Sequence, residues 1–147
     1  MTETNEGTIE ISIDDEIGYL IIKNPANRNA MNLSMYTLFP EAITKLLNAN
    51  IRAMIVRGYG EDAFGSGSDI SEFNELRSSE NAHIYDNAEV KAHTALAEVP
   101  VPTLAMIHGA CRGGGLAIAL ACDLRFASDD ASFAAPPAKL GIAFPDS

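Results

Sequence analysis

A chain of 147 residues with 47% hydrophobic residues fits one globular domain with a sizeable core. Its formal net charge of -10 argues against broad binding to nucleic acid or to an anionic membrane, because such binding requires a basic face. A small anionic ligand is not excluded, since a few local cations such as Arg28 suffice to bind one.

The N-terminus is polar and acidic, so it is neither a secretory signal nor a transit peptide. No apolar run reaches the roughly 18 residues of a membrane helix. Cys111 and Cys122 lack metal-ligand spacing, which favours reduced thiols in a cytoplasmic protein. We expect residues 1–7 to form a flexible tail and residues 8–147 to form one core.

The first half of that core predicts a hairpin followed by a helix. Residues 8–13 and 18–24 flank an acidic turn and are typical of two paired strands. Asn32 is a good N-cap for the helix that follows, in which apolar residues recur at helical spacing from Met35 to Leu47. Pro40 lies inside this pattern but off the apolar stripe, which predicts a bend.

The second half alternates strands and helices, which indicates an α/β domain. The pattern predicts a strand over 51–58, a loop rich in Gly and Ser, and a helical stretch over 70–99 that breaks near Ser78–Ser79. It then predicts a strand over 103–109, a tight turn over 111–115, a helix over 116–122, and short strands over 123–128 and 131–136. The chain stops after an apolar stretch, so we expect a truncated sheet with an uncovered face.

Two glycine-rich turns, FGSGSD and CRGGG, each follow a buried strand and precede a helix. Such turns present backbone N–H groups that stabilise an anion, although glycines also serve tight turns and close packing alone. Phosphate-loop, dinucleotide-binding and GxSxG motifs are absent, so Ser66 and Ser68 are not expected to be nucleophiles. The three histidines are too scattered for a metal site, and we expect none.

The combination of NRNAMN, AFGSGSDISEF, PVPTLAMIHGACRGGGLAIALACDLRFAS and FAAPPAKLGI resembles the crotonase (enoyl-CoA hydratase/isomerase) superfamily. Order and spacing agree from about residue 8 to the C-terminus, over the N-terminal part of that family's domain. The resemblance implies a crotonase-like α/β spiral of ββα units, without its C-terminal helical part. It also implies an acyl-CoA thioester as substrate, no separate cofactor, and a homotrimer or dimer of trimers at full length.

In residue terms, the resemblance assigns the two amides of an oxyanion hole to Ser68 and Gly114. Negative charge develops on a thioester oxygen when an adjacent proton is removed, and two aimed amides stabilise it. Arg28 and Ala30 lie in a segment that looks like the loop holding the adenine and pantetheine end. The other residues implied to line the substrate are Ser66, Gly67, Asp69, Ile70, Gly113, Pro136, Pro137 and Leu140.

The chain departs from the family at the two glutamates that hydratases use to split water. Their positions hold Ala117 and Pro137, which cannot transfer a proton, so isomerase-type proton transfer is favoured over hydration. Isomerase or lyase chemistry is in turn favoured over none. Asp146 lies near the position of a catalytic aspartate in some members, although Pro-Asp also begins turns. His83, His93 and Tyr85 are weaker candidates for the proton carrier.

Two alternatives to such an enzyme remain open. The first is a non-catalytic acyl-CoA-binding protein or assembly partner, because an apolar pocket with Ala117 and Pro137 suits binding as well as catalysis. The second is an unrelated α/β scaffold without a ligand, which would require four motifs to agree by accident.

Overall fold

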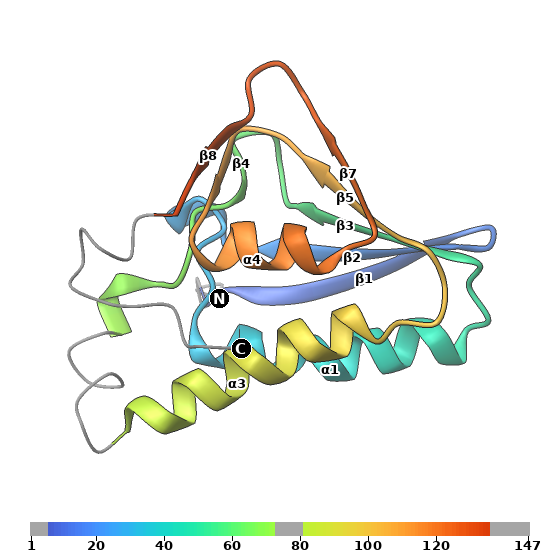
Figure 1. Ribbon diagram of the computed structural model, residues 1–147, viewed down its shortest axis with the longest axis horizontal. Coiled ribbons are helices and arrows are strands. Elements are labelled where there is room, and N and C mark those ends of the chain that lie inside the picture. The colour runs from blue at the N-terminus through green and yellow to red at the C-terminus, as the bar shows by residue number, and fades with distance from the viewer. Residues whose placement is uncertain (1–5, 73–80, 136–147) are drawn as a thin grey trace, which may run out of the picture.

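The computed structural model describes residues 6–72 and 81–135 (Figure 1). Strands β1 (Thr8–Asp14) and β2 (Ile17–Lys23) form an antiparallel hairpin, in which Thr8 lies opposite Lys23. The turn places Asp15 at a φ of 55°, a left-handed conformation that aspartate tolerates better than most residues. The predicted hairpin with its acidic turn is therefore confirmed.

Helix α1 (Leu33–Asn48) begins where the sequence predicts, because two side chains satisfy its first N–H groups. Asn32 Oδ1 accepts a hydrogen bond from the Met35 N–H at 2.9 Å, which is the predicted N-cap. Glu72 Oε2 accepts from the Leu33 N–H at 2.9 Å, and its negative charge suits this end of the helix dipole. The helix continues through Pro40, and the bend stays a prediction.

Two sheets, parallel except for the β1–β2 hairpin, follow from a repeated pattern in the chain. Strands β3 (Ala53–Gly58), β5 (Thr103–Ile107) and β7 (Leu124–Ala127) extend the hairpin into a five-stranded sheet of order β1-β2-β3-β5-β7. Each of these three strands leads into a short strand of a second sheet, of order β4-β6-β8. These short strands are β4 (Ala63–Gly65), β6 (Ala110–Arg112) and β8 (Ser132–Ala134).

The sequence analysis was wrong about β4 and β6, which it placed in a loop and a tight turn. Each has only three residues and adjoins glycines, so neither shows the alternating pattern of a strand. Their pairing partners are distant in sequence: Ala63 lies opposite Ala110, and Cys111 lies opposite Phe133.

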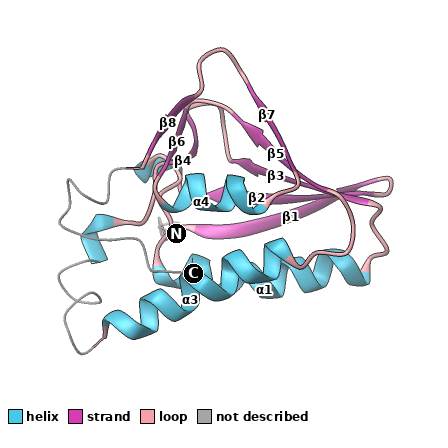
Figure 2. Cartoon of the chain, viewed as in Figure 1, coloured by secondary structure: helices cyan, strands magenta, loops and turns pink. Residues whose placement is uncertain are grey.

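The helices occupy two places in this framework. Helix α4 (Gly114–Ala121) lies between the two sheets, whereas α3 (Ala82–Ala97) runs beside α1 and also contacts α4 (Figure 2). Short 3-10 helices are η1 (Pro25–Asn27) and η2 (Ile70–Glu72). The helical stretch predicted over 70–99 is thus η2 and α3, and its predicted break at Ser78–Ser79 lies outside the described residues.

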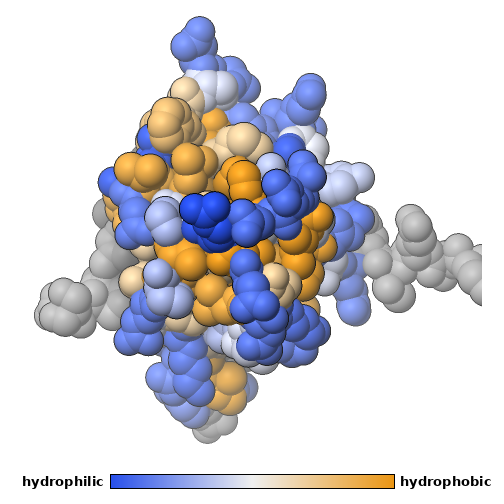
Figure 3. Space-filling view, turned by 90° about the vertical axis from the view of Figure 1, so that its right-hand side faces the viewer, coloured by the Kyte–Doolittle hydropathy of each residue, from blue (hydrophilic) through white to orange (hydrophobic). Residues whose placement is uncertain are grey.

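The core lies between the larger sheet and the helices. It is filled by fully buried side chains such as Leu20, Phe39, Met54, Phe64 and Ile118, each worth roughly 1.5–3 kcal/mol of hydrophobic stabilisation. Apolar surface also remains exposed among hydrophilic residues (Figure 3). The most exposed large apolar side chains of α4, β7 and β8 are Leu120, Leu124, Phe126 and Phe133. Within residues 6–72 and 81–135, no helix has the length and hydropathy to span a membrane.

Candidate active site

The two glycine-rich turns pack directly against each other, backbone to backbone. A Cβ on Gly65 would lie 3.3 Å from Gly115 Cα, and a Cβ on Gly113 would lie 3.6 Å from Gly67 Cα. Gly67 and Gly113 also adopt positive φ angles of 111° and 51°, which side chains disfavour. Close packing therefore explains part of the glycine content, as one interpretation of the sequence proposed. It also brings the ends of β4 and β6 together.

The hydrogen bonds around Ser68 show which way its backbone N–H faces. Its neighbours bond to Met31 on the other side: Gly67 O accepts from the Met31 N–H at 2.8 Å, and the Asp69 N–H donates to Met31 O at 2.8 Å. Because successive amides of an extended chain point in opposite directions, the Ser68 N–H faces away from Met31. Among the described residues, no group accepts a hydrogen bond from this N–H.

Gly114, whose amide is the second one predicted for the oxyanion hole, is the first residue of α4. The N–H groups of a first helical turn have no partner within the helix and carry the positive end of its dipole. Gly113 fixes the turn, because its N–H donates to Ala134 O and its carbonyl accepts from the Ala117 N–H, both at 3.0 Å. A Cβ on Gly114 would lie 3.5 Å from Ser68 Oγ, so the two predicted oxyanion residues are neighbours.

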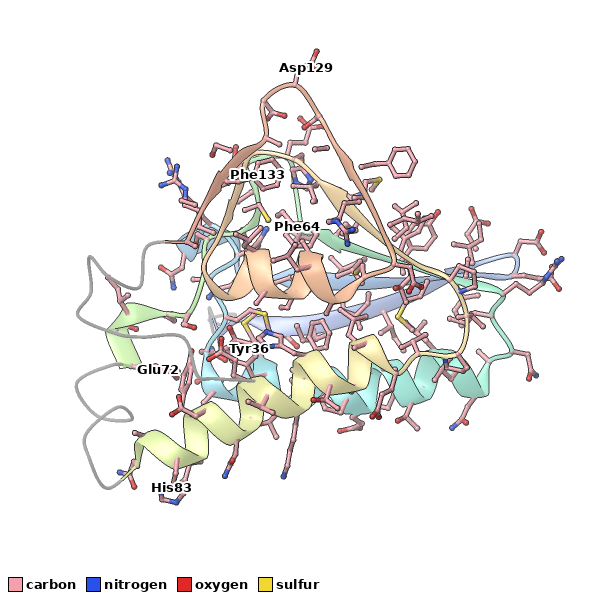
Figure 4. All side chains as sticks on the ribbon, viewed as in Figure 1. Tyr36, Phe64, Glu72, His83, Asp129 and Phe133 are labelled. Carbon is pink, nitrogen blue, oxygen red and sulfur yellow. The ribbon has the colours of Figure 1, made fainter. Side chains whose placement is uncertain are left out.

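Two side chains that the sequence analysis did not assign to the site also reach Gly114. Tyr36 projects from α1 toward α4 and is fully buried (Figure 4), and its Oη lies 3.3 Å from Ser68 Oγ. A Cβ on Gly114 would overlap Tyr36 Oη and would lie 3.5 Å from Oε1 of Glu89 on α3. For Tyr36, the only signal in the sequence was a hydroxyl group on an otherwise apolar helix face. Such a signal does not identify the partner of the hydroxyl.

The predicted ligand loop around Arg28 is held by two buried asparagines. Asn29 Nδ2 donates to Tyr59 O at 2.9 Å and to Ala63 O at 2.8 Å, while Asn29 Oδ1 accepts from the Asn24 N–H at 3.0 Å. Asn24 Nδ2 in turn donates to the carbonyl of the buried Ala30 at 2.8 Å.

Arg28 itself has a left-handed φ of 51° and an exposed side chain. Its carbonyl accepts from the Ser66 N–H at 3.1 Å, so the two predicted ligand segments lie side by side. The role of Arg28 as a ligand-binding cation stays a prediction.

The side chains of the second ligand segment have structural partners. Ser66 Oγ donates to Asn27 O at 3.0 Å, and Asp69 Oδ1 accepts from the Ser71 N–H at 3.0 Å and from Ser71 Oγ at 2.7 Å. Asp69 thus caps η2, whereas Ile70 is 63% exposed beside it. The four remaining predicted site residues, Pro136, Pro137, Leu140 and Asp146, lie outside the described residues.

The histidines give no metal site in the part of the chain that the structure describes, since no three His, Cys, Asp or Glu side chains gather there. His93 packs edge-on against Tyr36, with ring centroids 6.3 Å apart. Its Nε2 is buried without a hydrogen-bond partner among the described residues, and burial lowers the pKa of this imidazole.

Solved structures place this arrangement in the crotonase fold class. One is a crystal structure described as an enoyl-CoA hydratase/carnitine racemase from Magnetospirillum magneticum. It matches with a TM-score of 0.89 and 34% identity over 95% of this chain and 53% of its own. The two chains therefore share the fold over the N-terminal half of the solved structure.

The sequence narrows the class to a family. The family model for enoyl-CoA hydratase/isomerase matches residues 12–147, and the chain belongs to that family. A Δ(3,5)-Δ(2,4)-dienoyl-CoA isomerase of Arabidopsis thaliana is 33% identical over 97% of this chain and 56% of its own length. A short-chain-enoyl-CoA hydratase of Clostridium acetobutylicum is 33% identical over 88% and 49%. The chain therefore spans about half the length of these relatives.

Proposed function

We propose that this chain provides the oxyanion hole of an enzyme that shifts a double bond in an acyl-CoA thioester. In this proposal the thioester oxygen accepts hydrogen bonds from the backbone N–H groups of Ser68 and Gly114. The observation that carries it is the packing of the two glycine turns, which brings Ser68, whose N–H faces away from Met31, beside Gly114, the first residue of α4. Coenzyme A is part of the substrate, and no other cofactor is required.

The chemistry follows from charge. When a base removes the proton next to the thioester carbonyl, the C–H electron pair becomes part of an enolate and negative charge moves onto the oxygen. Two fixed N–H donors stabilise that charge in a partly buried site, and losing one such donor typically costs about 10²–10³ in rate. Gly114 is buried and Ser68 is partly buried, so solvent competes weakly for the oxygen.

Isomerisation is favoured over hydration because the positions of the two hydratase glutamates hold Ala117 and Pro137. Helix α4 reads GGLAIALA, so Ala117 and its neighbours carry no titratable side chain that activates water. A relative covering nearly the whole chain is named an isomerase. Arg28 and the residues from Ser66 to Ile70 are proposed to bind the coenzyme A portion. The cytoplasmic location, the trimeric state and the contribution of Asp146 stay predictions.

The amide of Gly114 is tested by comparing two substitutions in a common background. Proline at 114 removes the N–H, whereas alanine keeps it, but either would strike Tyr36 Oη. Both are therefore made together with Tyr36→Phe, which removes that oxygen. We expect G114P/Y36F to turn over an enoyl-CoA about 10²–10³-fold more slowly than G114A/Y36F. Equal rates in the two double variants would contradict the proposal.

A binding protein without turnover is distinguished by two measurements on the wild-type chain. Calorimetry against acyl-CoAs of increasing length tests binding, and absorbance assays with 2-enoyl- and 3-enoyl-CoA test turnover. Binding with isomerisation supports the proposal. Binding without turnover of any substrate would favour the non-catalytic alternative, and hydration of a 2-enoyl-CoA would contradict the stated preference.

A further inference from the structure

We propose that Glu89, on α3, carries the proton for the reaction at this oxyanion hole. This inference rests on the proposed function and extends it to a residue that the sequence analysis did not consider. Glu89 Oε1 lies 3.5 Å from the position that a Cβ on Gly114 would take, and Ser68 Oγ lies at the same distance from that position. A carboxylate therefore stands at the point where the two proposed oxyanion residues meet.

Two carboxylates that follow Ser68 in the chain accept hydrogen bonds from other groups. Asp69 Oδ1 accepts two hydrogen bonds from Ser71, and Glu72 Oε2 accepts from the first N–H of α1. The α4 helix offers no titratable group, since it is composed of Gly, Ala, Leu and Ile. Of the three atoms nearest to the Cβ position of Gly114, the one carboxylate oxygen is that of Glu89.

The placement of Glu89 relative to the hole is fixed through Met31. Met31 O accepts from the Asp69 N–H and also from Tyr85 Oη, at 2.8 and 3.1 Å. Tyr85 lies one turn before Glu89 on α3, so residues i and i+4 share a helix face. The same carbonyl thus ties α3 to the segment that orients the Ser68 amide.

Tyr36 also helps to fix the placement of Glu89. Its ring packs edge-on against Tyr85, with centroids 5.6 Å apart, while its hydroxyl contacts Ser68 Oγ. Both tyrosines are fully buried, and their packing therefore constrains how closely α1 and α3 approach each other near Glu89. Tyr36 is a positioning residue in this account, and Glu89 is the group that exchanges protons.

The proposed step balances in protons and electrons. The Glu89 carboxylate removes a proton from C2 of a 3-enoyl thioester, and the C2–H electron pair forms the C1–C2 double bond of an enolate. The carbonyl π electrons move onto the oxygen, held by the Ser68 and Gly114 amides. The electrons then return, the double bond moves to C2–C3, and the Glu89 carboxylic acid gives its proton to C4. Glu89 ends as a carboxylate.

Glu89→Gln tests this step, with Asp86→Asn as the matched control on the exposed face of the same helix. Each variant is checked by its circular dichroism and thermal melt, by calorimetry with a saturated acyl-CoA, and by exchange of the C2 protons for deuterium in D₂O. We expect E89Q to keep its affinity within about threefold and to lose exchange and isomerisation by about 10²–10⁴-fold. D86N should match the wild type.

The outcomes separate this inference from the proposed function. Unchanged exchange in a folded E89Q would overturn the role of Glu89 while leaving the oxyanion hole intact. A wild type that binds acyl-CoA but exchanges no C2 proton would also overturn it, and would leave binding intact. If E89Q fails to fold, E89D is used, and we expect slower but measurable exchange because its carboxylate is shorter by one methylene. Wild-type rates in E89D would count against the inference.

Discussion

The hydroxyl of Tyr36 occupies the space that a side chain on Gly114 would need. This relationship explains why the first residue of α4 is a glycine although its backbone does not require one: its φ is not positive, unlike that of Gly113. The cause is a tertiary contact between α1 and α4, which also brings Tyr36 Oη within 3.3 Å of Ser68 Oγ.

Gly114→Ala should therefore destabilise the protein by about 1–3 kcal/mol, as overpacking a core typically does. Tyr36→Phe in the same chain should recover part of this loss, because it removes the atom that collides with the new Cβ. Urea denaturation of the wild type, both single variants and the double variant measures this coupling. If the effects of the two single substitutions on the free energy of unfolding add strictly, the contact with Tyr36 is not the reason for a glycine at position 114.

Asn29→Ala should cost about 2–4 kcal/mol of unfolding free energy. It removes the partners of the Asn24 N–H and of the carbonyls of Tyr59 and Ala63, and each buried polar group left without a partner costs roughly 1–3 kcal/mol. Asn27→Ala, at an exposed position in the same loop, should change stability by less than about 0.5 kcal/mol. Equal effects of the two substitutions in chemical denaturation would refute the role given to Asn29.

The two thiols should react only when the protein opens. Burial raises the pKa of Cys111 to about 11 and that of Cys122 to about 12. At pH 8 each is therefore a thiolate in no more than about one molecule in a thousand, and both are shielded from reagents. A colorimetric disulfide reagent should label neither thiol in the folded chain and both in denaturant. Rapid labelling of the folded protein would contradict this burial.

Acid should weaken the fold through His93. Burial holds the pKa of this imidazole below its ordinary value of 6.5, so the unfolded chain binds more protons than the folded protein between those two pKa values. The free energy of unfolding should fall as the pH drops below about 6.5, and His93→Gln should reduce that slope. His83→Gln, at an exposed position, should leave it unchanged. Identical slopes for wild type and H93Q would count against this role.

The sequence predicted those parts of the fold that depend on local pattern. The hairpin, the Asn32 cap of α1, and the strands β3, β5, β7 and β8 follow from periodicity, turn residues and capping. The strands β4 and β6 were missed because three residues beside glycines carry no period, and their strand character comes from partners far along the chain.

The candidate site, like the fold, could be predicted from the sequence only where it depends on local pattern. The glycine-rich turns pointed to Ser68 and Gly114, because a glycine motif reflects the backbone conformation of the motif itself. Tyr36 and Glu89 look like ordinary positions of two amphipathic helices, and only the packing of α1 and α3 against α4 brings them to Gly114. Asn29 resembled a loop residue, whereas its side chain joins three backbone segments.

The central claim is that Ser68 and Gly114 polarise a thioester carbonyl. Infrared difference spectroscopy of a bound acyl-CoA labelled with ¹³C at that carbonyl measures the polarisation directly. The account predicts a carbonyl stretch at lower frequency in the complex than in water, with a smaller shift in G114P/Y36F than in G114A/Y36F. A bound thioester whose stretch matches the free ligand in water, or one that both double variants shift equally, would contradict it.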